Sequence, residues 1–136
     1  MSVGVLLITH PGIGTSMLHS ARRIIADSPL DTMCIAVPVD ANSERISDTA
    51  LKLIGQLDQG DGVLILTDLF GATPNNIART FSQPGKVAVL AGLNLPMLVR
   101  VFNYAHADLK SLCDTAVQGG ERGVHECRLE SAQDDA

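Results

Sequence analysis

Aromatic residues are scarce in this chain of 136 residues, which has no tryptophan, one tyrosine and three phenylalanines. Hydrophobic residues nevertheless make up 46% of it, so the core must be built from valine, isoleucine, leucine and alanine. This composition favours a parallel β-sheet with helices on both faces, because strands buried on both sides are rich in branched aliphatic residues. The length fits a single domain.

Blocks of basic residues and long apolar runs are also missing. The net charge of −5 gives no support to binding of nucleic acid or of an anionic membrane surface. The apolar run at 3–9 is too short to span a membrane, and no basic segment precedes it as in a signal peptide. We therefore expect a cytoplasmic protein without direct membrane insertion.

Cysteines are few and far apart, at Cys34, Cys113 and Cys127, with no CxxC pair. This pattern predicts reduced thiols in or near the core of a cytosolic protein. The sequence offers no cluster of histidines and cysteines with metal-ligand spacing. We expect no metal and no cofactor.

Apolar runs recur along the chain, and each is nearly continuous, as in strands buried on both faces. A segment of helical period follows each run. The four predicted strands are 3–9, 33–39, 62–68 and 87–92. Such alternation predicts an open, doubly wound α/β sheet of four parallel strands with helices on both faces.

The boundaries of the later elements are predicted from their turn residues. Thr73 is expected to cap the third helix, with Pro74 as its first residue. A fifth helix is expected over 108–118, ended by Gly119 and Gly120.

A short final strand is predicted over 123–129. We assign residues 1–130 to one domain and residues 131–136 to a disordered tail.

Polar residues follow all four predicted strands: His10, Asp40, Asp68 and Asn94. In open α/β sheets, ligands bind at the carboxyl ends of the strands where the strand order reverses. These residues should therefore share one edge. Asp40 and Asn94 are accessory candidates, with helix or turn capping as the alternative.

His10 and Asp68 form a pair with defined chemical roles. If Asp68 accepts a hydrogen bond from Nδ1–H of His10, the tautomer is fixed and Nε2 is left as a nucleophile. The alternative is a capping or hydrogen-bonded core histidine.

Small residues lie before the helix starts in "HPGIGTS" and "LFGATPNN". Unpaired N–H groups at helix starts, together with Gly12, Gly14 and Gly71, suit an anion such as phosphate. Thr73 would add a hydroxyl group. A histidine nucleophile beside such a cradle predicts a phosphohistidine.

Three other phosphate sites fit less well. A dinucleotide fingerprint would need glycine at Met17, although Asp40 has the place of its ribose-binding acid, so it stays a weak alternative. A P-loop would need a lysine after the glycines. A receiver-type phosphoaspartate domain would need acids where His10 stands, and Lys86 precedes its strand at the wrong edge.

The motifs "THPGIG", "TDLFGATPNN" and "AGLNLPMLVR" resemble the mannose/fructose-type enzyme IIA of the bacterial phosphotransferase system, over residues 3–129. The resemblance implies that His10 accepts a phosphoryl group from phospho-HPr and passes it to a IIB component. It implies that Asp68 orients the imidazole. The phosphoryl-binding residues expected are Gly12, Gly14, Phe70, Gly71, Ala72 and Thr73.

The resemblance also implies a homodimer in which the strand 123–129 crosses to the partner's sheet and runs antiparallel there. Ala72 stands where the family commonly has a second glycine, and Pro11 stands where it has glycine or another small residue; neither departure removes a functional group. No IIB domain follows, so the acceptor is expected to be a separate chain. The alternatives are a regulatory module that binds a partner according to its phosphorylation, and the phosphoryl donor of dihydroxyacetone kinase.

Overall fold

The computed structural model describes residues 2–129. These residues form the strands β1 (Gly4–Thr9), β2 (Thr32–Ala36), β3 (Val63–Thr67) and β4 (Val87–Ala91). The helices are α1 (Ile13–Ile24), α2 (Ser43–Leu57), α3 (Thr73–Arg79), α4 (Leu95–Asn103) and α5 (Leu109–Arg122). Strand and helix alternate as far as α4, as the sequence predicts.

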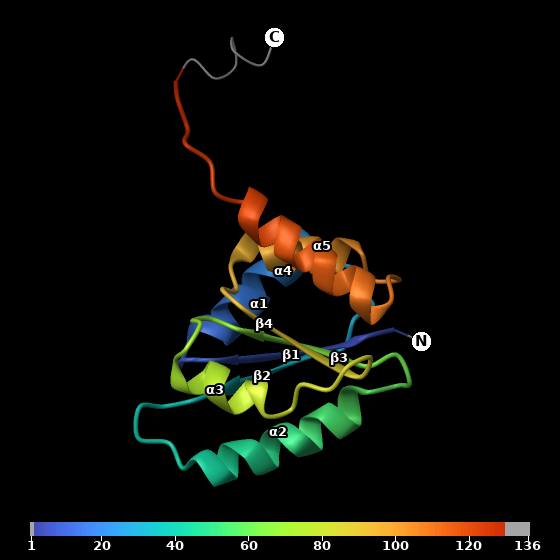
Figure 1. Ribbon diagram of the computed structural model, residues 1–136. Coiled ribbons are helices and arrows are strands. Elements are labelled where there is room, and N and C mark those ends of the chain that lie inside the picture. The colour runs from blue at the N-terminus through green and yellow to red at the C-terminus, as the bar shows by residue number, and fades with distance from the viewer. Residues whose placement is uncertain (1, 130–136) are drawn as a thin grey trace.

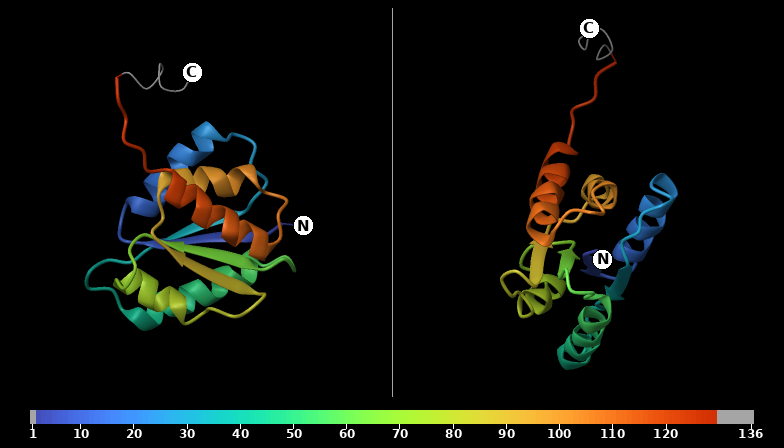
Figure 2. Two further views of the ribbon diagram at one scale, coloured as in Figure 1. Left: turned by 45° about the horizontal axis from the view of Figure 1, so that its top comes forward. Right: turned by 90° about the vertical axis from the view of Figure 1, so that its right-hand side faces the viewer.

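The strands form one parallel sheet in the order β2-β1-β3-β4, which confirms the predicted doubly wound architecture. Helices α1, α4 and α5 cover one face, and α2 and α3 cover the other (Figures 1 and 2). The chain leaves β1 toward one edge of the sheet and β3 toward the other. The strand order therefore reverses between β1 and β3, at the centre of the sheet.

The core has two parts, one on each face of the sheet. Alternate residues of the central strands point to opposite faces, so that Val5 and Leu7 join the α1/α4/α5 cluster while Leu6 and Ile8 join the α2/α3 cluster. All four are fully buried. Burial on both sides explains why these strands are continuous apolar runs rather than alternating ones.

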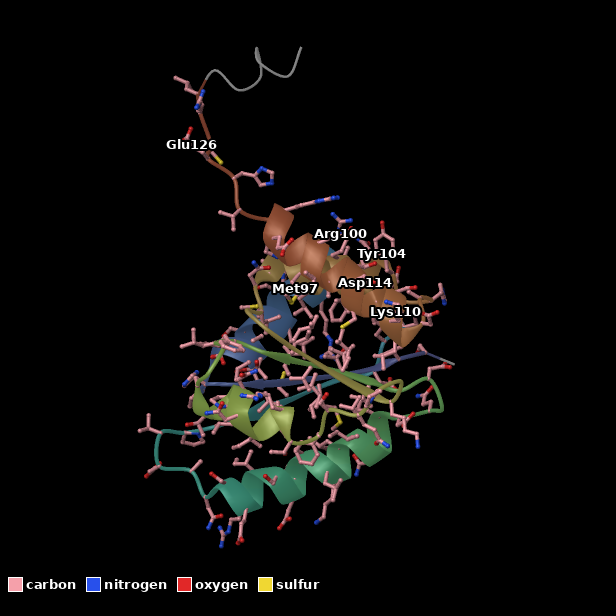
Figure 3. All side chains as sticks on the ribbon, viewed as in Figure 1. Met97, Arg100, Tyr104, Lys110, Asp114 and Glu126 are labelled. Atoms are coloured by element: carbon pink, nitrogen blue, oxygen red, sulfur yellow. The ribbon has the colours of Figure 1, made fainter. Side chains whose placement is uncertain are left out.

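Helix α5 is longer than predicted, because it continues through Gly119 and Gly120 to Arg122. The two glycines allow close packing against α4, whose Met97, Arg100 and Tyr104 are labelled in Figure 3. A Cβ atom on Gly119 would lie 2.7 Å from Cβ of Arg100, and one on Gly120 would lie 2.9 Å from Cε of Met97. Glycine here serves helix packing and does not end the helix.

Two further boundaries differ from the prediction. Ala72, not Thr73, is the N-cap of α3, and Thr73 is its first residue. Residues 124–128 have no regular structure in the single chain, so the predicted strand over 123–129 is not formed there. The predicted tail, 131–136, lies outside the described residues.

The glycine contact between α4 and α5 can be tested with Gly119→Ala. Alanine favours a helix by about 1 kcal/mol over glycine, but the close approach of Arg100 leaves no room for its methyl group. We expect Gly119→Ala to lower the free energy of unfolding by about 1–3 kcal/mol, as measured by urea denaturation.

Gly55→Ala is the matched control, because Gly55 lies inside α2 and a Cβ there would meet nothing within 4 Å. This substitution should raise stability by about 0.5–1 kcal/mol. Equal effects of the two substitutions would contradict the packing role of Gly119.

Candidate functional site

His10 and Asp68 lie side by side at the point where the strand order reverses. Each directly follows the last residue of a central strand, Thr9 of β1 or Thr67 of β3. The parallel register pairs Ile8 with Thr67, which sets Thr9 level with Asp68. The structure therefore brings together two residues that are 58 positions apart, as the sequence predicts.

One carboxylate oxygen of Asp68 binds His10 twice. Nδ1 of the imidazole lies 2.7 Å from Oδ2, and the backbone N–H of His10 donates to the same oxygen at 3.0 Å. Since the carboxylate can only accept, Nδ1 carries a proton, and in the neutral imidazole Nε2 is then the nitrogen with a free lone pair. The Asp68 side chain is 6% exposed and the His10 side chain 37%, so the pair opens to solvent on the histidine side.

The carboxyl group of Asp68 is held in its charged form by these bonds. Burial raises its pKa, but the hydrogen bonds from the ring and the backbone N–H of His10 outweigh burial and set the pKa below the usual 3.8. Its other oxygen, Oδ1, is buried and has no hydrogen-bond partner among the described residues. The negative charge of Asp68 thus depends on His10 for its compensation.

A buried threonine hydroxyl holds the turn after His10. Thr9 Oγ1 donates to the carbonyl of His10 at 2.8 Å and accepts from the N–H of Gly14 at 2.9 Å. Between them, Gly12 has φ +84° and caps α1. This left-handed backbone conformation favours glycine, which has no Cβ atom to clash there.

The turn after Asp68 is held by two asparagines of α3. Asn75 Oδ1 accepts from the N–H of Gly71 at 3.1 Å, and Asn75 Nδ2 donates to Thr67 Oγ1 at 3.1 Å. Asn76 Nδ2 donates to the Gly71 carbonyl, also at 3.1 Å. The sequence analysis did not single out Asn75, because a polar residue in the first turn of a helix is usually exposed, whereas this one is 2% exposed.

Two of the glycine amides expected to bind an anion are already engaged. The N–H of Gly14 donates to Thr9, and that of Gly71 donates to Asn75. The acceptors of both N–H groups are buried side chains of the protein itself. This corrects the expectation that both amides face a ligand. Within residues 2–129, the N–H groups of Gly12 and Thr73 have no acceptor and stay available.

The remaining predicted residues have diverse surroundings. Ala72 caps α3 through its backbone. Phe70 is 77% exposed, so its side chain presents an apolar surface beside the turn after Asp68. Asn94 caps α4 by accepting from the N–H of Met97 at 2.9 Å and donates to the carbonyl of Gly120 at 3.1 Å.

Asp40 lies exposed in the turn before α2, because β2 ends at Ala36. Neither Asp40 nor Asn94 is hydrogen-bonded to the His10–Asp68 pair.

Two further properties concern the described residues as a whole. They hold no group of three or more histidine, cysteine, aspartate or glutamate side chains placed to bind a metal ion. Among the described helices, none has both the length and the hydrophobicity needed to cross a membrane.

The sheet and the polar edge at its centre define an open α/β protein of the doubly wound class. A model of the family described as "PTS system fructose IIA component" matches residues 4–117. The chain belongs to this family, the mannose/fructose-type IIA components of the phosphotransferase system.

Individual relatives are similar along nearly the whole chain. The mannose-specific EIIAB component of Escherichia coli K12 is 28% identical over 127 residues, which are 91% of this chain and 39% of that protein. The chain thus spans about two fifths of that relative's length. The fructose-specific EIIA component of Bacillus subtilis is 24% identical over 129 residues, with 92% and 86% covered.

A solved structure shows the same fold. The mannose/sorbose-specific IIA subunit from Enterococcus faecalis superposes with a TM-score of 0.82 at 23% identity, covering 95% of this chain and 97% of that one.

The charge of Asp68 can be tested through the pH dependence of stability. Because the folded pKa lies below the usual value, the charged carboxylate stabilises the fold above that value and loses its effect as the pH falls through the folded pKa. At about pH 5 we expect Asp68→Asn to have a free energy of unfolding about 1–3 kcal/mol lower than that of the wild type. This difference should shrink toward pH 3, as followed by urea titrations at each pH. A difference that grows on acidification would contradict the assignment.

Proposed function

We propose that this protein is a phosphoryl carrier that accepts a phosphoryl group on Nε2 of His10 and passes it to a second protein. The observation that carries the proposal is the His10–Asp68 pair at the reversal point of the sheet, with Nδ1 bound at 2.7 Å and the ring partly exposed. Family membership supports the same role.

The transfer follows from the state of the ring. The lone pair of Nε2 attacks phosphorus in line, the new N–P bond forms, and the bond from phosphorus to the donor's leaving atom breaks with its electron pair going to the donor. The proton on Nδ1 stays in place, so the ring becomes cationic. Asp68, whose Oδ2 accepts the hydrogen bond from Nδ1, compensates this charge.

The phosphoryl oxygens would lie near the start of α1. The dipole of this 12-residue helix is positive at that end, and Gly12, the N-cap of α1, adds a backbone N–H without an acceptor among the described residues. Thr73 is exposed and contributes a free N–H and a hydroxyl. No metal or nucleotide takes part in this transfer.

Donor and acceptor would be proteins that dock over His10. Leu69 and Phe70, directly after Asp68, are 60% and 77% exposed and supply apolar contact area at the rim of the site. We assign phospho-HPr as the donor and a IIB protein as the acceptor, as membership of this family implies. The E. coli relative, which is named for an A and a B component, supports the choice of acceptor. The protein would act in the cytoplasm, and its reaction would serve sugar uptake.

We further propose that two copies form a homodimer. Residues Ala88–Ala91 of the edge strand β4 are only half-buried, and the segment 124–128 has no regular structure within its own chain. A strand of the partner, added antiparallel to β4, would satisfy the open backbone groups at this edge.

Phosphorylation can be measured by intact mass after incubation with phosphoenolpyruvate, enzyme I and HPr. We expect a gain of about 80 Da on the wild type and none on His10→Ala, because the nucleophile is lost. His19→Ala is the matched control, since His19 is exposed on α1, and it should gain the same mass. No gain on the wild type, or an undiminished gain on His10→Ala, would refute the proposal.

The dimer can be tested by gel filtration of two shortened chains. A chain ending at Arg122 keeps all five described helices and should elute as a monomer, because it lacks the exchanged strand. A chain ending at Leu129 keeps that segment and should remain dimeric. Dimers of equal stability in both chains would count against strand exchange.

A further inference from the structure

Asn75 spans the turn that begins with Asp68. Its Nδ2 donates to the hydroxyl of Thr67, which precedes Asp68, and its Oδ1 accepts from the N–H of Gly71, three residues after Asp68. The hydroxyl of Thr67 in turn donates to the carbonyl of Leu90 in β4 at 3.3 Å. One buried amide therefore links the two ends of this turn to the sheet.

Packing alone does not hold Gly71 in place. Its φ is +84°, and a Cβ built on it would meet no atom within 4 Å, so no neighbouring atom packs against that side of the residue. The hydrogen bonds from Asn75 and Asn76 are what restrain it, one on its N–H and one on its carbonyl.

The two asparagines differ in how strongly they can hold the turn. Asn76 is exposed and can exchange its bond with water, whereas Asn75 is 2% exposed. A buried amide that loses its partners cannot be solvated, so opening the turn at Asn75 is costly.

We propose that Asn75 is a positioning residue for phosphoryl transfer: it closes the turn from Thr67 to Gly71 so that the carboxylate of Asp68 stays aimed at Nδ1 of His10. The side chain of Asn75 is hydrogen-bonded to Thr67 and Gly71 and not to His10. It acts through Asp68, whose two bonds to His10 require the turn to keep its shape. The inference rests on the proposed carrier function for its kinetic readout.

The test compares substitutions that remove hydrogen bonds while keeping side-chain size. Asn75→Leu removes both bonds of the amide. Thr67→Val removes the hydroxyl, and Thr67→Ser restores it. Thr32→Val is the matched control. Thr32 is a buried threonine whose hydroxyl donates to the Leu30 carbonyl, and it is the first residue of β2, whereas Thr67 is the last residue of β3.

The rate of phosphorylation by phospho-HPr is measured over a range of donor concentrations. We expect Asn75→Leu and Thr67→Val to lower the maximal rate about tenfold or more, since small displacements of catalytic groups have effects of this size. The donor concentration at half-maximal rate should change little. Thr67→Ser should recover most of the rate, and the double variant should lose no more than either single one, because both act through one chain of bonds.

The ¹⁵N chemical shifts of the His10 ring give a second readout that needs no donor. In the wild type they should report one tautomer with the proton on Nδ1, and in Asn75→Leu a mixture of both. Thr32→Val should lose stability in urea but keep the wild-type shifts and rate. If Asn75→Leu does not fold, the Thr67→Val and Thr67→Ser pair gives the same comparison.

The outcomes separate the two proposals. A phosphorylated wild type together with unchanged rates and ring shifts in Asn75→Leu overturns the positioning role and leaves the carrier function standing. A wild type that takes up no phosphate refutes the carrier function, and the ring shifts then decide the positioning role alone: altered shifts in Asn75→Leu support it, and unaltered shifts overturn it.

Discussion

The hydrogen bond between His10 and Asp68 joins the two halves of the sheet at the place where their strand order reverses. It exists because β1 and β3 are neighbours in register, so that residues 58 positions apart end their strands level with each other. Hydrogen bonds from the residues next to the pair fix the two strand ends. Thr9 and Thr67 are the last residues of their strands, and each uses its hydroxyl to hold the turn that follows. The site is thus an extension of the rigid sheet, and only its outer rim is formed by exposed loop residues.

The two turns share one design but differ in how they carry it out. After His10, the hydroxyl of Thr9 reaches the backbone of Gly14 directly. After Asp68, the segment between strand and helix is longer, and the side-chain amide of Asn75 bridges Thr67 and Gly71. In both cases a glycine N–H is taken up by a side chain beneath it. The turns therefore gain rigidity at the expense of free donors for an anion.

The sequence was sufficient for the sheet and for the pair at its centre. Strands buried on both faces leave continuous apolar runs, and the residues directly after them must meet at one edge, which placed His10 beside Asp68. It was not sufficient where the outcome depended on a contact between distant segments. Gly119 and Gly120 form a usual helix stop, and only the proximity of α4 explains why α5 continues through them. The burial of Asn75 likewise depends on how α3 lies against the end of β3, which no local pattern records.

The exposure of His10 on a single side limits the order of events in a carrier of this kind. Asp68 covers Nδ1, so Nε2 is the ring nitrogen left for a protein partner, and the exposed side chains of Leu69 and Phe70 directly follow Asp68 in the chain. For the carrier proposed above, a donor and an acceptor that both approach Nε2 would bind in turn and compete with each other, and transfer would follow a ping-pong scheme.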